Sequence, residues 1–202
     1  MKKLVSFKII FVVFFSFFVN ETVLAGPCDT TISTATTSQL SCADNDSLTV
    51  TSDGSIAYDD QNAVEAQQHD GVTITNRGTI KTTTDGSNGD SAIKGQSSLN
   101  LTITNSGTIW AKEDYGIKLI EAEKVTITNE AGGTISSTGL IAIGADNAFS
   151  PTIKNSGTIS ATHASGIGIN LSQSDAENLG SGATITNSGT IEASGATSDG
   201  IK

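Results

Sequence analysis

Three pairs of carboxylates are the residues of this chain whose type and spacing best suit acid–base chemistry. Hydrolysis of a glycosidic bond needs two carboxyl groups that face each other across the substrate. Each pair falls in a segment expected to be a loop, and we expect no acid one structural repeat above it to complete a cleft. We therefore interpret them as solvated loop acids. The pairs are Asp44 with Asp46, Asp59 with Asp60, and Asp85 with Asp90.

The histidines and the single arginine give no stronger catalytic signal. His69 and His163 have no cysteine or acid at the spacing of a metal site. A lyase would need a basic residue beside acidic calcium ligands, and Arg77 lies in an expected turn. The nucleophile motif G-x-S-x-G is absent. The sequence therefore predicts no catalytic residue, no cofactor and no metal site.

Cys28 and Cys42 are the two cysteines of the chain. A pair of cysteines in an exported protein predicts a disulfide. Closing a loop of this length stabilises a fold by about 3 kcal/mol on the chain-entropy estimate. A metal or redox site with two cysteines is the alternative, although no further ligand accompanies them.

One seven-residue phrase recurs along the chain, and residues 103–109 show it as ITNSGTI. Measured at the asparagine, successive copies are 24 to 32 residues apart. A repeat of this length is typical of a solenoid. The copy at residues 127–135 has two extra residues in its turn, and a worn first copy at residues 50–56 carries Ser52 at the asparagine position. The five asparagines are Asn76, Asn105, Asn129, Asn155 and Asn187.

Each copy predicts two short strands joined by a corner. Isoleucine and threonine are β-branched and favour extended backbone, whereas asparagine and glycine tolerate the left-handed backbone of a turn. A second apolar phrase, such as residues 115–117 or 166–169, adds a third strand to each period. A hairpin would also fit the first two strands. Three strands per period instead favour an all-β, right-handed parallel β-helix of about six coils.

This fold predicts what lies inside and what lies outside. Neighbouring coils are about 4.8 Å apart, so the isoleucines should stack as internal columns. The five asparagines should stack as a ladder of side-chain amides between coils. The longer corners, such as residues 83–95, 121–124, 144–150 and 173–182, should project outward as variable loops.

The chain divides into three segments. Residues 1–25 combine Lys2 and Lys3 with an apolar run and a small-residue cleavage site, which predicts an export signal. Residues 26–48 contain both cysteines and lack the repeat, so we expect an N-terminal cap over the first coil. Residues 49–202 form the β-helix and end within a coil. The mature chain has no apolar run long enough to span a membrane.

The formal net charge of −10 excludes a basic surface that could neutralise the phosphates of a nucleic acid. The expected partners are the export machinery and surface components of a host or neighbouring cell, either glycan or protein.

The export signal, the cysteine-bearing cap and the ITNSGTI coils together resemble the passenger region of Gram-negative autotransporters. This resemblance covers residues 26–202. It implies a non-catalytic, adhesive or structural β-helical stalk that reaches the cell surface through a C-terminal outer-membrane barrel. No run of barrel strands is visible in the sequence, and without one the protein would remain periplasmic. The alternatives are the N-terminal part of a β-helical carbohydrate-active enzyme, with its site beyond residue 202, and a truncated reading frame.

Overall fold

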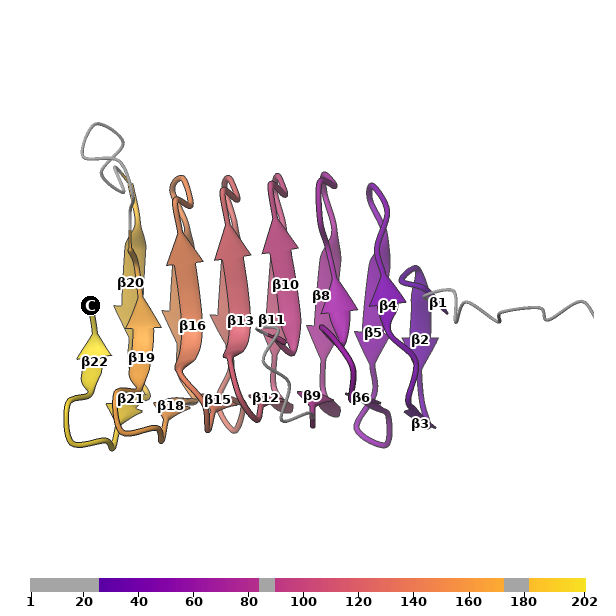
Figure 1. Cartoon of the computed structure of the whole chain (residues 1–202). Helices are drawn as coiled ribbons and strands as arrows, with labels where there is room; N and C mark the ends of the chain where they lie inside the picture. The colour runs from indigo at the N-terminus through magenta and orange to yellow at the C-terminus, as the bar shows by residue number, and fades with distance from the viewer. Residues whose placement is uncertain (1–25, 84–89, 173–181) are drawn as a thin grey trace, which may run out of the picture.

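The computed structural model describes residues 26–83, 90–172 and 182–202. Within these ranges all regular structure is β-strand, and every strand pair is parallel. The coils stack side by side into one rod, from the indigo N-terminal end to the yellow C-terminal end (Figure 1). The predicted all-β parallel β-helix is therefore confirmed.

Three parallel sheets form the sides of the rod, and we name them A, B and C. Sheet A contains β1 (Gly26–Pro27), β4 (Leu40–Ser41), β7 (Val64–Glu65), β10 (Ile93–Gln96), β13 (Tyr115–Ile120), β16 (Ile141–Asp146), β19 (Ile167–Asn170) and β22 (Asp199–Ile201). Sheet B contains β2 (Thr30–Ile32), β5 (Ser47–Val50), β8 (Thr73–Asn76), β11 (Thr102–Asn105), β14 (Thr126–Asn129), β17 (Thr152–Asn155) and β20 (Thr184–Asn187). Sheet C contains β3 (Ala35–Thr36), β6 (Ser55–Tyr58), β9 (Thr79–Thr82), β12 (Thr108–Ala111), β15 (Thr134–Ser137), β18 (Thr158–Ala161) and β21 (Thr190–Ala193).

The core consists of isoleucine columns that follow the repeat. In sheet B, Ile103 pairs in register with Ile74 on one side and Ile127 on the other, and all three are fully buried. Ile109 and Ile135 continue the same arrangement in sheet C. The side chains alternate because successive residues of a strand point to opposite faces. Each coil thus buries its isoleucines against those of its neighbours.

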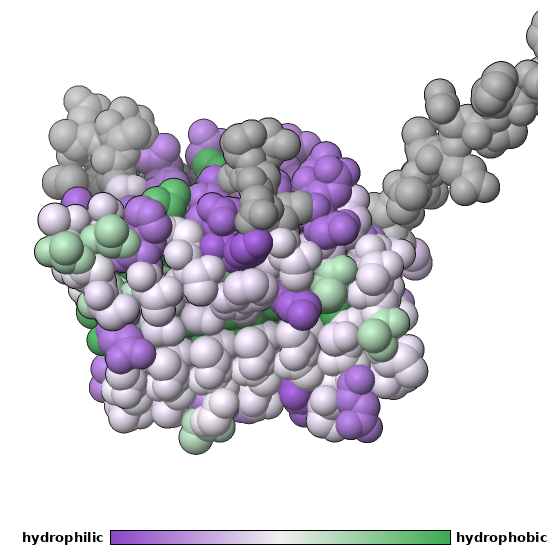
Figure 2. All heavy atoms as spheres, turned by 60° about the horizontal axis from the view of Figure 1, so that its bottom comes forward, coloured by the Kyte–Doolittle hydropathy of each residue, from purple (hydrophilic) through white to green (hydrophobic). Residues whose placement is uncertain are grey.

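The outer face of sheet C carries threonine and other small polar residues in register, with Thr108 between Thr79 and Thr134. Trp110, on the same strand, is half-buried and pairs in register with Lys81. Figure 2 turns this side of the rod forward and shows pale, weakly polar residues in regular rows. The strongly hydrophilic residues gather towards the upper edge of that view.

The segment 26–48, expected to be a cap, contributes a coil of its own. Strands β2, β3 and β4 pair in parallel with β5, β6 and β7, and β1 adds one more strand to sheet A. Its strands have only two or three residues and lack the ITNSGTI phrase. The periodicity therefore could not reveal this coil, and six further coils follow it from β5 onward.

The assignment of Ser52 to the asparagine position was wrong. Val50 pairs with Asn76, and Ile56 pairs with Ile80. The first ITNSGTI-like copy therefore has a corner two residues longer than the standard one, like the copy that contains Asn129. The repeat pattern did not reveal the longer corner, because the residue at the asparagine position, Val50, is apolar, whereas Ser52 is polar and lies in the turn.

The corner from sheet A to sheet B is more regular than its variable sequence suggested. Residues 121–124 begin and end with residues in the left-handed region, Glu121 at φ 52° and Lys124 at φ 55°. The corner at residues 97–100 repeats this pattern, and Gly71 takes the place of Lys124 two coils earlier. Residues 144–146, expected in a loop, belong to β16. Backbone geometry repeats in this corner although residue types do not.

Candidate functional site

The ladder asparagines lie at the corner between sheets B and C, and their amides connect the coils. Asn105 donates from Nδ2 to Oδ1 of Asn129 at 2.8 Å, and the same nitrogen donates to the carbonyl oxygens of Gly107 and Thr134. Asn76, Asn129 and Asn155 each repeat this set of three bonds. Burial of each amide requires such partners. These residues therefore fix the register of the coils.

The ladder begins with an unpaired atom. Oδ1 of Asn76 is buried and has no hydrogen-bond partner, because Val50 occupies the position from which an asparagine would donate. At the other end of the described ladder, Asn187 accepts from Asn155 and donates to the carbonyl oxygen of Gly189. Every bond between these asparagines points the same way along the rod.

Cys28 and Cys42 form a disulfide in the first coil, with their Cα atoms 4.5 Å apart. Both residues are buried and belong to the hydrophobic core. Cys42 also donates its backbone N–H to the carbonyl oxygen of Glu65 in the next coil at 2.8 Å. The disulfide is thus part of the packed end of the rod.

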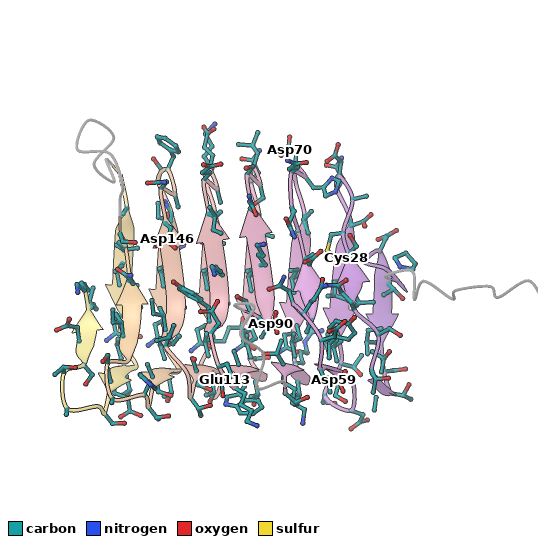
Figure 3. The ribbon with its side chains drawn as sticks, viewed as in Figure 1. Cys28, Asp59, Asp70, Asp90, Glu113 and Asp146 are labelled. Atoms are coloured by element: carbon teal, nitrogen blue, oxygen red, sulfur yellow. A yellow bond between two sulfur atoms is a disulfide. The ribbon has the colours of Figure 1, made fainter. Side chains whose placement is uncertain are left out.

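Two of the three carboxylate pairs lie wholly within the described residues, and each of their members is either exposed or bound in a corner. Asp59 and Asp60 are exposed at the corner between sheets C and A, where Figure 3 labels Asp59. Asp46 accepts the backbone N–H of Ala43 at 2.7 Å, and Asp44 is bound to residues of the next coil. These contacts are typical of loop acids.

Asp90 departs from the expectation that no acid lies one coil above a member of these pairs. Its predicted partner, Asp85, falls outside the described residues, whereas Asp90 is buried and its charge acts on Asp114 in the next coil. Asp114 was not predicted as a site residue, although it follows Asp90 by 24 residues. Because 24 residues is the length of one repeat, this spacing could have indicated that the two acids lie in neighbouring coils.

Asp114 belongs to a cluster on the outer side of sheet A that the sequence analysis missed. Lys118 donates from Nζ to Oδ2 of Asp114 at 3.0 Å, and Nζ also lies 4.5 Å from the centre of the Tyr115 ring. The ring packs against Gly144, where an added Cβ would lie 2.3 Å from Cε1 of Tyr115. On the same strand as Gly144, Asp146 accepts from Ser172. The four side chains of this sheet A cluster are Asp114, Tyr115, Lys118 and Asp146.

Electrostatics in the sheet A cluster follow from burial. Burial raises the pKa of Asp114, the charges of Asp90 and Asp146 raise it further, and the hydrogen bond from Lys118 opposes them. Burial together with the charges of Asp146 and Asp114 raises the pKa of Tyr115 to about 12. Lys118 offsets the burial of Asp114 and covers the Tyr115 ring. The charged and polar groups of the cluster therefore find their partners within the cluster.

The two histidines lie apart from the sheet A cluster. Nδ1 of His69 lies 3.0 Å from Oδ1 of Asp44, and His163 accepts the backbone N–H of Ser165. Among the described residues, no group of three or more His, Cys, Asp or Glu side chains could hold a metal ion. The same part of the chain contains no helix with the length and hydrophobicity to cross a membrane.

Comparisons with known proteins place this rod in a family. No curated protein and no solved structure matches the chain. The family model described as the BigA third pectate lyase-like domain matches residues 25–201. This match covers the whole described rod, including the first coil, which lacks the ITNSGTI phrase. The chain therefore belongs to the family of the BigA third pectate lyase-like domain.

Proposed function

We propose that this chain is a non-catalytic β-helical stalk that is exported to the cell surface, where it has an adhesive or structural role. The role is geometric: a rigid rod holds its corner loops at fixed spacing and orientation. The residues that recur most strictly are used inside the rod, to stack one coil on the next.

The in-register ladder of asparagines and isoleucines is the observation that carries the proposal. Asn105 donates to its equivalent in the next coil and to neighbouring backbone, and Ile103 pairs in register with Ile74 and Ile127. A repeat used for stacking leaves the corners free to vary, and loops on a rigid scaffold are where proteins usually place binding residues. The exposed residues at the corners between sheets C and A, such as Asp59, Glu113 and Leu140, are therefore the positions through which a glycan or protein on another cell would be bound.

Export is supported by the pattern of residues 1–25, which lie outside the described residues. The pattern has a positive start, an apolar run and a small-residue cleavage site. The disulfide Cys28–Cys42 fits an oxidising compartment. The resemblance to autotransporter passengers extends this proposal to the outer surface of the cell.

The pectate lyase-like description of the family makes pectate cleavage the enzymatic alternative to test. The purified protein would be incubated with polygalacturonate and calcium, and unsaturated products would be followed by ultraviolet absorbance. We expect no cleavage above the buffer rate, because Lys118, the lysine of the sheet A cluster, is already paired with Asp114.

The control separates a contaminant from a true activity. Asp114→Asn removes the charge that pairs with Lys118, so a lyase that used this cluster would lose its rate. Cleavage by the wild type that disappears in Asp114→Asn would overturn the non-catalytic proposal. Cleavage that is equal in both variants and is removed by further purification would leave it standing.

A further inference from the structure

His69 connects the disulfide-bonded first coil to the second coil at the corner between sheets A and B. Its Nδ1 lies 3.0 Å from Oδ1 of Asp44, and the same oxygen accepts the backbone N–H of Asp70 at 3.0 Å. The His69 side chain is 34% exposed. The contact spans 25 residues of sequence, so it joins two coils and is not local.

A backbone hydrogen bond beside the His69–Asp44 contact also joins the first and second coils. Asn45, which follows Asp44, donates its N–H to the carbonyl oxygen of Asp70 at 2.8 Å. Asn100 and Lys124 make the equivalent bonds in later coils, to Glu123 and Phe149. In those coils no histidine lies at the corner. The chain therefore contains the same backbone joint with and without a histidine beside it.

The charged groups around His69 are acidic. Asp44 and Asp46 come from the preceding corner, and Asp70 is its own neighbour in the chain. The corner on the other side, residues 97–100, carries no titratable side chain. The hydrogen bond from the backbone of Asp70, followed by that from His69, lowers the pKa of Asp44. Asp44 therefore stays ionised where an imidazole takes up a proton.

We infer that His69 and Asp44 form a pH-dependent latch between the first and second coils. When the imidazole is protonated, the hydrogen bond becomes an ion pair and the joint tightens. At higher pH the imidazole is neutral, and a hydrogen bond from a neutral donor to the ionised Asp44 remains. The lowered pKa of Asp44 sets the lower end of the pH range in which the latch is closed, because stability from an ionised carboxylate is lost as the pH falls through its pKa.

Native-state hydrogen exchange of single amides tests the latch. The rates of Asn45, Asn100 and Lys124 would be measured near pH 5.5 and near pH 8 and corrected for intrinsic exchange. We expect the protection of Asn45 to rise roughly two- to fivefold on acidification, the size of an exposed ion pair. The protection of Asn100 and Lys124 should not change with it.

Two variants attribute the effect to its side chains. His69→Gln keeps a neutral side chain that can donate, and Asp44→Asn keeps an oxygen that can accept from Asp70. We expect either change to remove the pH-dependent part of the protection of Asn45, whereas His163→Gln should leave it intact. The inference is overturned if Asn45 and Asn100 respond equally to pH, or if the response of Asn45 survives in His69→Gln.

Discussion

At the scale of single residues, the ladder asparagines from Asn76 to Asn155 are buried, and their side-chain nitrogens donate to oxygens in their own turn and in the next coil. Each donating amide between Asn76 and Asn155 reaches one oxygen in its own turn and two in the next coil. A net hydrogen bond contributes only about 1 kcal/mol, but an orphaned buried group costs about 1–3 kcal/mol. The ladder is therefore most sensitive where removal of one amide affects both neighbouring coils: the next asparagine loses the donor to its Oδ1, and the preceding asparagine loses one of its three acceptors.

Asn105→Ala should lower the free energy of unfolding by about 2–4 kcal/mol. It removes one of the three acceptors of Asn76 and leaves the buried Oδ1 of Asn129 without its donor. Asn76→Ala should lower the free energy of unfolding by only about 1 kcal/mol, because Oδ1 of Asn76 already lacks a partner. Urea unfolding of both variants measures the difference. Equal losses would contradict the ladder as described.

Tyr115 gives a second prediction at this scale. Tyr115 is the only tyrosine that remains in a Tyr58→Phe variant. Its pKa of about 12 predicts that the phenol ionises well above the ordinary pKa near 10. Because the pKa is raised by folding, the associated stability is complete below about pH 10 and is lost as the pH rises through about 12. Ultraviolet titration of the phenolate checks this, and a midpoint near pH 10 in the folded protein would refute the described environment.

At the scale of elements, the corner between sheets A and B tolerates many residue types while keeping one backbone geometry. Lys124 holds a left-handed conformation that Gly71 adopts in the equivalent place two coils earlier. A left-handed conformation costs a residue with a Cβ roughly 1–2 kcal/mol relative to glycine.

Lys124→Gly should therefore raise the free energy of unfolding by about 0.5–1 kcal/mol, after part of the gain is lost to the greater freedom of glycine when unfolded. Thermal and urea unfolding would measure the change. Thr126→Gly, in the middle of sheet B, is the matched control and should destabilise the protein. A loss of stability in Lys124→Gly would contradict the left-handed geometry of this corner.

The sequence predicted those elements in which residue type and backbone geometry repeat together. Strands such as β11 and β12 were predicted because Ile103 and Ile109 recur with the asparagine. The first coil and the corner between sheets A and B repeat only in backbone geometry, so residue types gave no sign of them. The sheet A cluster was missed because Asp114, at the end of a corner, meets Lys118 on the strand that follows, a pair that the repeat does not contain. Only the 24-residue step from Asp90 indicated it.

At the scale of the whole molecule, each coil contacts only its neighbours, so stability should be a sum of nearest-neighbour terms. Damage in the middle of the rod separates two stacks, whereas damage at an end removes one coil. The isoleucine columns are the continuous part of this arrangement.

Ile103→Asp should destabilise the rod by at least about 4 kcal/mol, because it buries an unpaired charge between Ile74 and Ile127. Thr104→Asp places the same charge on the outer face of the same strand and should cost about 1 kcal/mol or less. Thermal unfolding followed by circular dichroism compares the two. Equal melting temperatures would contradict the inward column.

The location of the native protein tests the central claim most directly. Cells would be fractionated before and after treatment with external protease and probed with an antibody against residues 100–200. A surface stalk predicts a band in the outer-membrane or secreted fraction that external protease removes or shortens. A band that stays in the periplasm and resists external protease would contradict display at the surface, and with it the adhesive role.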